Sequence, residues 1–405
     1  MNIIVQKFGG TSVSSSQKRM RVIEKARDAM ARGYFPVLVV SAMGRSGEPY
    51  ATDTLLSLVN KSAGGADPRD TDMLISCGEI ISAVVMASEL RGQGIDAHAV
   101  SGAQAGIYTD DTYGHAECVA MDPRYLRAMI ERGVVPVVAG FQGRTAGGDT
   151  TTLGRGGSDT TASILGAGLG ASLVEIYTDV DGILTADPRI VPDAALLREM
   201  SYEEVFQMAD NGSRVIHPRA VDIAMQGGVP VVVRGTLSDD PGTHICARVP
   251  LHDDTKPNDV VTSIAHIAGR LQVTVEAVAP SREHRLLRNL AAAGVSIDLI
   301  NIFPDTMVFT VSGDQREPLM RVLEEDGCRY RLRENCCKVS AVGVRMRGVP
   351  GVMARIMQAL SGSGVTVLQT VDSHMTISCL VSGDEAETAI RSLHREFGLA
   401  RHMRE

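Results

Sequence analysis

The sequence predicts an α/β fold in which a domain built on a mainly parallel sheet precedes two ferredoxin-like βαββαβ units. Three observations support this prediction. Near-continuous apolar runs alternate with helical stretches up to about residue 245, a polar segment with two prolines follows, and the remaining chain repeats itself after 70 residues. Alternating strands and helices are typical of a parallel sheet covered on both faces.

Six apolar runs in the first 245 residues have the composition of buried parallel strands. They are IIVQ (3–6), PVLVVS (36–41), IDAHAV (95–100), VVPVVAG (134–140), SLVEIYT (172–178) and VPVVVRG (229–235). Helices are expected between them at residues 16–32, 53–60, 71–91, 123–132, 158–169 and 218–226. The first domain is therefore expected to span residues 1–245.

Residues 246–262 are expected to form a linker, because they are polar and carry two prolines. Beyond them, residues 285–313 align without a gap on residues 355–383. The repeat predicts units at 263–335 and 336–405, each with the order strand, helix, strand, strand, helix, strand. A final strand near residues 398–403 can belong to the second unit or cross back to the first.

Composition limits the function classes. The chain has 405 residues, a net charge of −8 and a pI near 5.7, which argues against a nucleic-acid partner. No apolar run approaches the roughly 18 residues of a membrane span, and the first residues lack the features of a signal peptide. Seven cysteines without a CxxC pattern indicate neither a disulfide framework nor a zinc site. We therefore expect a cytoplasmic protein without a protein-bound metal.

The stretch VQKFGGTSV, residues 5–13, places a lysine at the end of the first strand and two glycines directly after it. Gly9 and Gly10 allow a tight turn that presents backbone N–H groups to an anion, and Lys7 can reach across it as a point charge. The order is the reverse of a Walker loop. The alternative is a plain glycine turn with a solvated lysine.

A second glycine-rich motif, LGRGGSDTTASILGAGLGA, occupies residues 153–171. Arg155 is suited to bidentate recognition of a carboxylate. Ser158 to Thr161 are expected to form the cap and first turn of a helix, and Asp159 is either that cap or a catalytic partner. The motif lacks the third glycine and the acidic residue of a dinucleotide fingerprint.

Two further motifs follow strands or begin helices. YTDVDGILTADPR, residues 177–189, follows a strand as ligand-binding loops of open α/β sheets do, and its spacing does not fit a calcium loop. SAMGRSGEPYATD (41–53) offers hydroxyl groups. SCGE (76–79) places Glu79 in apolar surroundings, where it is either a solvated helix charge or a partner for a substrate ammonium.

In this order, the motifs resemble those of the monofunctional aspartate kinases. The stretches that carry the resemblance are VQKFGGTSV, VVSAMG, SCGE, GRGGSDTTA, YTDVDG, TADPR and HPRAVDIAM. The repeat units look like ACT domains, and the resemblance covers essentially the whole chain. It implies an amino-acid kinase fold, a reaction of ATP with L-aspartate to give 4-phospho-L-aspartate, ATP with Mg²⁺ as cofactor, and a place at the start of lysine, threonine and methionine biosynthesis.

The resemblance also implies roles for individual residues. Lys7 and Asp159 would be catalytic, with Asp159 orienting Lys7. The ATP site would comprise Lys7, Phe8, Gly9, Gly10, Ser12, Ser41, Ser158, Thr178, Asp179, Arg189 and Arg214. The aspartate site would comprise Thr52, Asp53, Glu79, Arg155, Gly156, Gly157 and Ser158, with Arg155 on the α-carboxylate and Glu79 on the α-ammonium.

Two departures from the family pattern stand out. Relatives commonly carry a lysine where this chain has Arg214, and the loop at residues 45–51 is longer than in many of them. This loop and residues 367–377 look most like the Bacillus-type, diaminopimelate-sensitive branch.

Feedback regulation is expected through the repeat. An effector amino acid, which could be lysine, threonine or diaminopimelate, would bind the first copy at Gly294, Ser296, Asp298 and Asn301, because Asp298 can pair with its ammonium. The second copy has Leu368 and Val371 in place of Asp298 and Asn301. It would mainly build the interface of a homodimer or higher homo-oligomer through residues 263–405.

Two alternatives remain at this stage. The first is another enzyme of the same fold, such as an acetylglutamate or uridylate kinase, which would lack the ACT pair. The second is an amino-acid-sensing regulatory protein with an inactive kinase domain, which loss of Lys7, Arg155 or Asp159 would have favoured.

Overall fold

The computed structural model describes residues 1–59, 66–213, 215–247, 260–276, 280–344, 346 and 349–400. These residues form two compact units. The first unit takes its residues from 1–183, 196–209 and 214–250, and the second from 184–195, 210–213 and 251–405. Two short segments of the predicted first domain therefore pack with the second unit, and most of the predicted linker lies outside the described residues.

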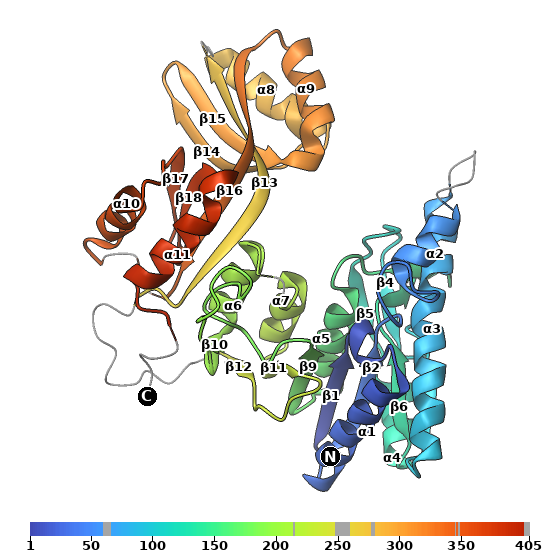
Figure 1. Ribbon diagram of the computed structural model, residues 1–405. Helices are drawn as coiled ribbons and strands as arrows, with labels where there is room; N and C mark the ends of the chain where they lie inside the picture. Colours follow the sequence, from blue (N-terminus) through green and yellow to red (C-terminus); the bar gives the residue numbers. More distant parts are fainter. Residues whose placement is uncertain are drawn as a thin grey trace. The chain divides into compact units, whose positions relative to one another are not determined.

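The first unit is built on an eight-stranded sheet with the order β10-β12-β11-β9-β1-β2-β6-β3. Its six central and edge strands from β11 to β3 are all parallel, and they are the six strands predicted from the apolar runs (Figure 1). Their bounds are β1 (Ile3–Phe8), β2 (Phe35–Val40), β3 (Ala97–Val100), β6 (Val135–Ala139), β9 (Leu173–Thr178) and β11 (Val231–Gly235). Strand β12 (Thr243–Cys246) runs antiparallel to β11, and β10 (Glu199–Ser201) lies beside it.

Helices pack on the sheet through apolar residues. One face buries Phe8, Leu38 and Val137 against Ile23 and Leu90. The small-residue helix lies close to its neighbours, since a Cβ at Gly166 would come within 2.4 Å of Val174. The helices of this unit are α1 (Ser16–Ala31), α2 (Thr52–Val59), α3 (Pro68–Gly92), α4 (Arg124–Glu131), α5 (Gly157–Leu169), α6 (Tyr202–Asp210) and α7 (Pro218–Gln226). The sequence predicted all of these except α6.

Helix α3 corrects one expectation. By length and composition it is long and apolar enough to cross a membrane, and half of its apolar window is buried in the protein. Met86 and Leu90 pack in the core beneath the sheet, and the helix also buries the carboxyl groups of Asp72 and Glu79. Apolar and acidic side chains of α3 are thus both buried within the first unit.

A second, four-stranded sheet has the order β5-β4-β7-β8. Its strands are β4 (Ile107–Thr109), β5 (Cys118–Met121), β7 (Gln142–Arg144) and β8 (Thr150–Thr152). None of them was predicted, because each has only three or four residues. Strand β8 leads directly into the glycine-rich motif before α5, so this sheet fixes where that motif begins.

The second unit contains one six-stranded antiparallel sheet with the order β14-β15-β13-β16-β18-β17. Its strands are β13 (Ser263–Glu276), β14 (Ile297–Phe303), β15 (Thr306–Ser312), β16 (Arg329–Val342), β17 (Gln369–Asp372) and β18 (Thr376–Ser382). The helices are α8 (Pro280–Ala292), α9 (Arg316–Glu325), α10 (Val352–Gly362) and α11 (Ala386–Glu396). Both copies of the repeat thus contribute to one sheet (Figure 1).

The two copies share their longest strands, which corrects the predicted order of the second copy. Residues 263–267 of β13 pair with residues 338–342 of β16 and take the place of the second copy's fourth strand. The predicted boundary at 335/336 therefore falls inside β16. Ala400 forms an isolated antiparallel bridge with Ala194, and residues 401–403 of the expected final strand lie outside the described residues.

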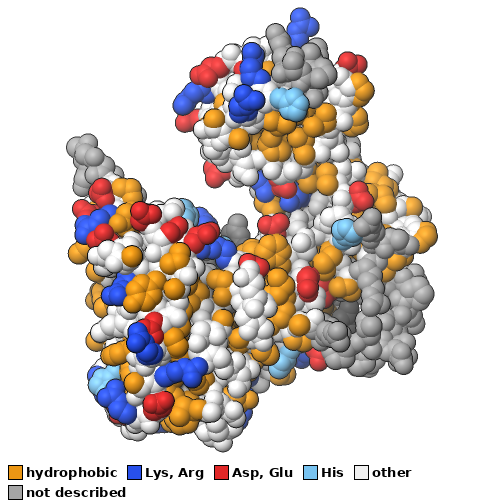
Figure 2. All heavy atoms as spheres, turned by 180° about the vertical axis from the view of Figure 1, so that it is seen from behind, with side chains coloured by type: hydrophobic (Ala, Val, Ile, Leu, Met, Phe, Trp, Pro, Cys, Tyr) orange, Lys and Arg blue, Asp and Glu red, His pale blue; other side chains and the backbone are white. Residues whose placement is uncertain are grey.

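The segments of the chain that leave the first unit are bound to this sheet and its helices. Thr185 Oγ1 lies 3.0 Å from His394 Nε2 of α11, and the Oγ of Ser340 in β16 donates to Asn211 Oδ1 over 2.9 Å. All four side chains belong to the second unit. On the face of the molecule drawn in Figure 2, acidic and basic side chains are interspersed.

The repeat makes a matched prediction about stability. Leu290 and Leu360 occupy equivalent positions in α8 and α10 and are fully buried in the cores of the two copies. Replacing either by alanine should lower the free energy of unfolding of the second unit by about 2–5 kcal/mol. Met357→Ala, on the exposed side of α10, is the control and should change it by less than about 0.5 kcal/mol. Denaturant unfolding measures the three values, and a loss as small as the control's at either leucine would contradict the equivalence.

Candidate functional site

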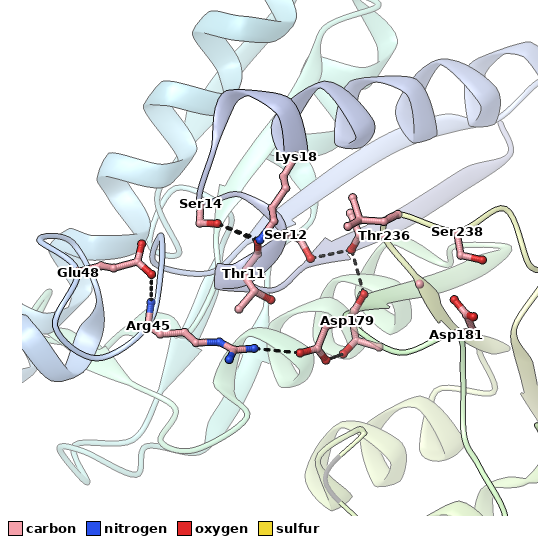
Figure 3. Close-up of a pocket in the computed structure, with 13 residues that line it drawn as sticks. Thr11, Ser12, Ser14, Lys18, Arg45, Glu48, Asp179, Asp181, Thr236 and Ser238 are labelled. Atoms are coloured by element: carbon pink, nitrogen blue, oxygen red, sulfur yellow. Dashed lines mark hydrogen bonds and ion pairs between the residues drawn. The ribbon is translucent and has the colours of Figure 1, made fainter. Parts of the chain in front are cut away.

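The carboxyl ends of parallel strands β1, β2, β9 and β11 meet at one edge of the first unit's sheet, where ligands of open α/β sheets bind. The loops that follow these strands surround a pocket of about 550 Å³ (Figure 3). Its lining residues are Thr11, Ser12, Ser14, Lys18, Arg45, Glu48, Thr178, Asp179, Asp181, Gly235, Thr236, Leu237 and Ser238. Seven of these residues come from the motifs identified in the sequence, namely Thr11, Ser12, Arg45, Glu48, Thr178, Asp179 and Asp181.

The turn after β1 requires glycine. A Cβ at Gly10 would come within 2.4 Å of the carbonyl oxygen of Ala42, and Gly10 O accepts a hydrogen bond from Gly44 N over 3.1 Å. The loops after β1 and β2 are therefore in direct backbone contact. Ser12 Oγ lies 2.6 Å from Thr236 Oγ1, which connects the turn to the loop after β11 as well.

Lys7, at the end of β1, forms an ion pair with Asp159. Its Nζ lies 2.7 Å from Asp159 Oδ1, and each side chain is only 12% exposed. Asp159 is in the first turn of α5, whose N-cap is Gly156 with φ of +68°. The prediction that Ser158 to Thr161 include the cap is therefore wrong, and the Asp159 carboxylate faces Lys7.

Glu79 is buried in the middle of α3 and only partly compensated. Its Oε1 accepts a hydrogen bond from Ala42 N over 3.1 Å, whereas the buried Oε2 has no hydrogen-bond partner among the described residues. Burial raises the pKa of Glu79 to about 8, and the bond from Ala42 opposes this rise. The carboxyl group is therefore mostly protonated at neutral pH, and a cation beside Oε2 would favour its ionised form.

Arg155 is exposed in the glycine-rich loop, and its guanidinium makes no hydrogen bond or ion pair with the described residues. The loop itself is held from α7. Arg219 donates to Leu153 O over 3.0 Å and to Ala116 O over 3.1 Å, and a Cβ at Gly156 would collide with His217 at 2.3 Å. The backbone is thus fixed while the Arg155 side chain remains available.

Sequence reasoning missed the residues that frame this loop. Arg219 was visible only as part of the HPRAVDIAM stretch. The buried carboxylate of Asp72 in α3 accepts from Gly114 N and from both the N and Oγ1 of Thr152, at 2.7 to 2.9 Å. The available indication was an aspartate two turns before Glu79 on the same apolar helix. Lys18, Glu48 and Thr236 of the pocket were missed as well.

Several other predicted site residues lie near the sheet edge. Phe8 is fully buried and stacks on Tyr177 with ring centroids 4.6 Å apart, so a ligand could meet only its backbone. Thr178 Oγ1 donates to Asp179 Oδ1 over 3.2 Å. Ser41 N donates to Phe8 O, which places Ser41 beside the β1 turn. Ser158 is buried behind the glycine-rich loop.

The remaining predicted residues differ in what surrounds them. Thr52 and Asp53 begin α2, which continues the loop after β2. Arg189 belongs to the second unit, where its exposed guanidinium pairs with Asp187 at 2.6 Å. Arg214 lies outside the described residues. Among the residues that the structure describes, no three His, Cys, Asp or Glu side chains are grouped to hold a metal ion.

The predicted effector residues lie in the first copy of the repeat, and Asp298 is already paired. Its carboxylate lies 2.8 Å from Lys338 Nζ and 3.1 Å from the Arg270 guanidinium. Asn301 Oδ1 accepts a hydrogen bond from Gln369 Nε2 over 2.7 Å, which joins β14 to β17 of the second copy. Gln315 bonds both Gly294 O and Ser296 N. An effector would therefore have to compete with Lys338 and Arg270 for Asp298.

Comparison with known proteins covers the whole chain. The profile of the amino acid kinase family matches residues 2–235, and that of an ACT domain matches residues 331–395. The chain is 44% identical to aspartokinase 1 of Bacillus subtilis, over 99% of this chain and 100% of that protein. It is 38% identical to the aspartokinase of Mycolicibacterium smegmatis, over 98% and 97% of the two chains.

Solved structures give the same result. The fold is similar to E. coli aspartokinase III in complex with aspartate and ADP in its R-state, with a TM-score of 0.80 and 25% identity over 98% of this chain and 99% of that one. The T-state of the same enzyme, in complex with lysine and aspartate, has a TM-score of 0.76, with 25% identity and the same coverage.

The raised pKa of Glu79 predicts a pH dependence of stability in the ligand-free protein. The folded state keeps the Glu79 proton up to about pH 8, whereas an unfolded chain loses it near 4.5. Because the folded state binds the extra proton between these values, the free energy of unfolding should fall as pH rises through this window. Glu79→Gln removes the effect. Unfolding of the first unit at several pH values should therefore give a stability advantage of the variant that grows toward pH 8, and a constant difference would contradict the shift.

Proposed function

The chain belongs to the aspartokinases of the amino acid kinase family, and we propose that it transfers the γ-phosphoryl group of ATP to the β-carboxylate of L-aspartate, giving 4-phospho-L-aspartate and ADP. The observation that carries this proposal is the position of Ala42. Its N–H bonds Glu79, and its carbonyl oxygen lies against Gly10 of the β1 turn. A site for an ammonium group therefore lies directly beside a turn suited to phosphates.

The residues around this point match the two substrates. The turn at Gly9 and Gly10 and the pocket beyond it would hold the phosphates and nucleoside of ATP. The glycine-rich loop would place Arg155 on the α-carboxylate of aspartate, since a guanidinium binds a carboxylate through two parallel hydrogen bonds. Glu79 would bind the α-ammonium with its unpartnered Oε2, giving up its proton as the cation arrives.

The chemistry needs charge neutralisation more than proton transfer. A β-carboxylate is already ionised at pH 7, so no general base is required, and the main obstacle is the approach of two anions. Lys7 would lie between them and stabilise negative charge on the transferring phosphoryl group. Asp159 would hold the Lys7 ammonium in place through their ion pair. Mg²⁺ would arrive with ATP and be bound mainly by phosphate oxygens and water, and the Glu48, Asp179 and Asp181 carboxylates line the pocket where it would lie.

Regulation is proposed to act through the second unit. An amino-acid effector, lysine, threonine or diaminopimelate, would place its ammonium on Asp298 and displace Lys338 or Arg270 from it. Chains would associate through this unit into a homodimer or larger homo-oligomer, and the enzyme would act in the cytoplasm. An effector that binds one arrangement of the units better than another shifts activity by that difference in affinity.

A coupled assay of ADP formation tests the function directly. ATP consumption should depend on L-aspartate and be absent with N-acetylglutamate or UMP, which are the acceptors of other enzymes with this fold. Turnover with only one of these two acceptors would contradict the proposal and assign the protein the activity of another enzyme with this fold. Binding of ligands without turnover of any acceptor would favour the regulatory protein with an inactive kinase domain.

The role of Lys7 predicts a large effect on turnover. Lys7→Ala should lower kcat by about 100-fold or more, because the ammonium acts on charge that develops in the transition state. Steady-state kinetics measure this, and thermal unfolding checks that the first unit remains folded. Turnover close to that of the parent enzyme would remove Lys7 from the mechanism.

The regulatory site predicts a separable phenotype. Asp298→Asn keeps the shape of the side chain but removes its charge, so the effector concentration for half-inhibition should rise by about 10-fold or more while uninhibited activity stays the same. Asparagine is preferable to alanine because it can still accept hydrogen bonds from Lys338 and Arg270. Asp326→Asn, which alters a carboxylate paired with Arg285 in the same copy, is the control. The assignment fails if Asp298→Asn is as sensitive as the parent to each effector that inhibits the parent.

A further inference from the structure

The loop after β2 carries an arginine across the mouth of the nucleotide pocket. Arg45 lies on the side of the pocket formed by this loop, and its guanidinium pairs with Asp179 on the opposite side at 3.1 Å (Figure 3). Lys18 is the other cation that lines the pocket, whereas Glu48, Asp179 and Asp181 contribute three carboxylates. The pocket lining therefore carries three carboxylates against two cations, so an entering polyphosphate is stabilised mainly by contact with these cations.

The backbone at Arg45 is fixed. Gly44 adopts φ of +91° and donates its N–H to Gly10 O, while Glu48 Oε1 accepts from Arg45 N over 3.1 Å and Glu48 N donates to Arg45 O over 2.9 Å. These bonds tie the base of the Arg45 side chain to the turn at Gly10. The loop thus holds the Cα of Arg45 at a constant place beside the pocket.

The Arg45 side chain, by contrast, is held weakly. It is 70% exposed and Asp179 is 61% exposed, and an ion pair between such exposed groups contributes little to stability. Its guanidinium can therefore leave Asp179 without disturbing the fold. A planar guanidinium can bind phosphate oxygens through two parallel hydrogen bonds, whereas Arg45 makes one hydrogen bond to Asp179.

We propose that Arg45 is a nucleotide-binding residue that exchanges Asp179 for the phosphates of ATP. This inference rests on the proposed function, because it takes the pocket to be the ATP site. In the ligand-free protein the Arg45 to Asp179 pair spans the mouth of the pocket. When ATP enters, Arg45 binds phosphate oxygens, and Asp179 becomes free for the nucleoside. The longer loop at residues 45–51 thereby acquires a role in binding.

The test compares ligands with and without phosphates on the wild type, Arg45→Ala and Arg45→Lys. Isothermal titration with Mg²⁺-ATP, and competition by adenosine against ATP, give the two dissociation constants. Arg45→Ala should weaken ATP binding by about 10-fold or more and change adenosine binding by less than about threefold. Arg45→Lys should fall between, because it keeps the charge and loses the fork. In turnover, KM for ATP should rise while KM for aspartate stays unchanged.

Arg124→Ala is the control, since Arg124 is also an exposed arginine that pairs with an aspartate, Asp122, elsewhere in the first unit. It should leave both dissociation constants unchanged. The proposal is overturned if Arg45→Ala binds ATP as tightly as the wild type. It is also overturned if ATP and adenosine weaken equally, which would mean that Arg45 acts through Asp179 or the loop. The binding measurements contain no phosphoryl acceptor. They therefore test the role of Arg45 in ATP binding even if the enzyme does not phosphorylate aspartate.

Discussion

The Lys7 to Asp159 ion pair is the interaction on which the proposed site depends. It joins the tip of β1 to the first turn of α5, and so fixes the phosphate turn relative to the glycine-rich loop. Both groups are largely removed from water, where an unpaired charge would be strongly unfavourable. Each therefore holds the other in place. In the proposed function, this places a cation where the two substrate anions would meet.

Around this pair, the fold supplies close backbone contacts where side chains could not fit. Gly10 lies against Ala42, and Gly156 lies against His217. Ala42 in turn bonds the buried carboxyl of Glu79, so the turn after β1, the loop after β2 and helix α3 form one connected set. In the proposed function, binding energy from the ammonium of aspartate would thereby be used at the point where phosphate and carboxylate meet.

The sequence predicted those features that depend on local pattern. The six apolar runs form six parallel strands in the structure, because a strand buried on both faces needs an uninterrupted run of apolar residues. The four short strands of the second sheet and helix α6 were missed, since three or four residues carry too little periodicity. Asp159 was considered as a helix cap because caps are set by neighbours in sequence, whereas Gly156 takes that position and leaves Asp159 to pair with Lys7.

Arg219 and Asp72 act through partners 42 to 103 residues away, which no local pattern reveals. The sharing of β13 between the two repeats was equally invisible, because the second copy resembles the first in sequence while borrowing a strand from it.

In the proposed site, Glu79 is protonated and partly unpaired until the ammonium of aspartate binds to it. Calorimetric titration of L-aspartate at pH 7, repeated in buffers with different heats of ionisation, counts the protons exchanged on binding. With a pKa of about 8 in the free protein, Glu79 should release close to one proton per site as the ammonium pairs with it. Glu79→Gln should release none. Binding to the wild type without proton release, or the same release from the variant, would contradict the account.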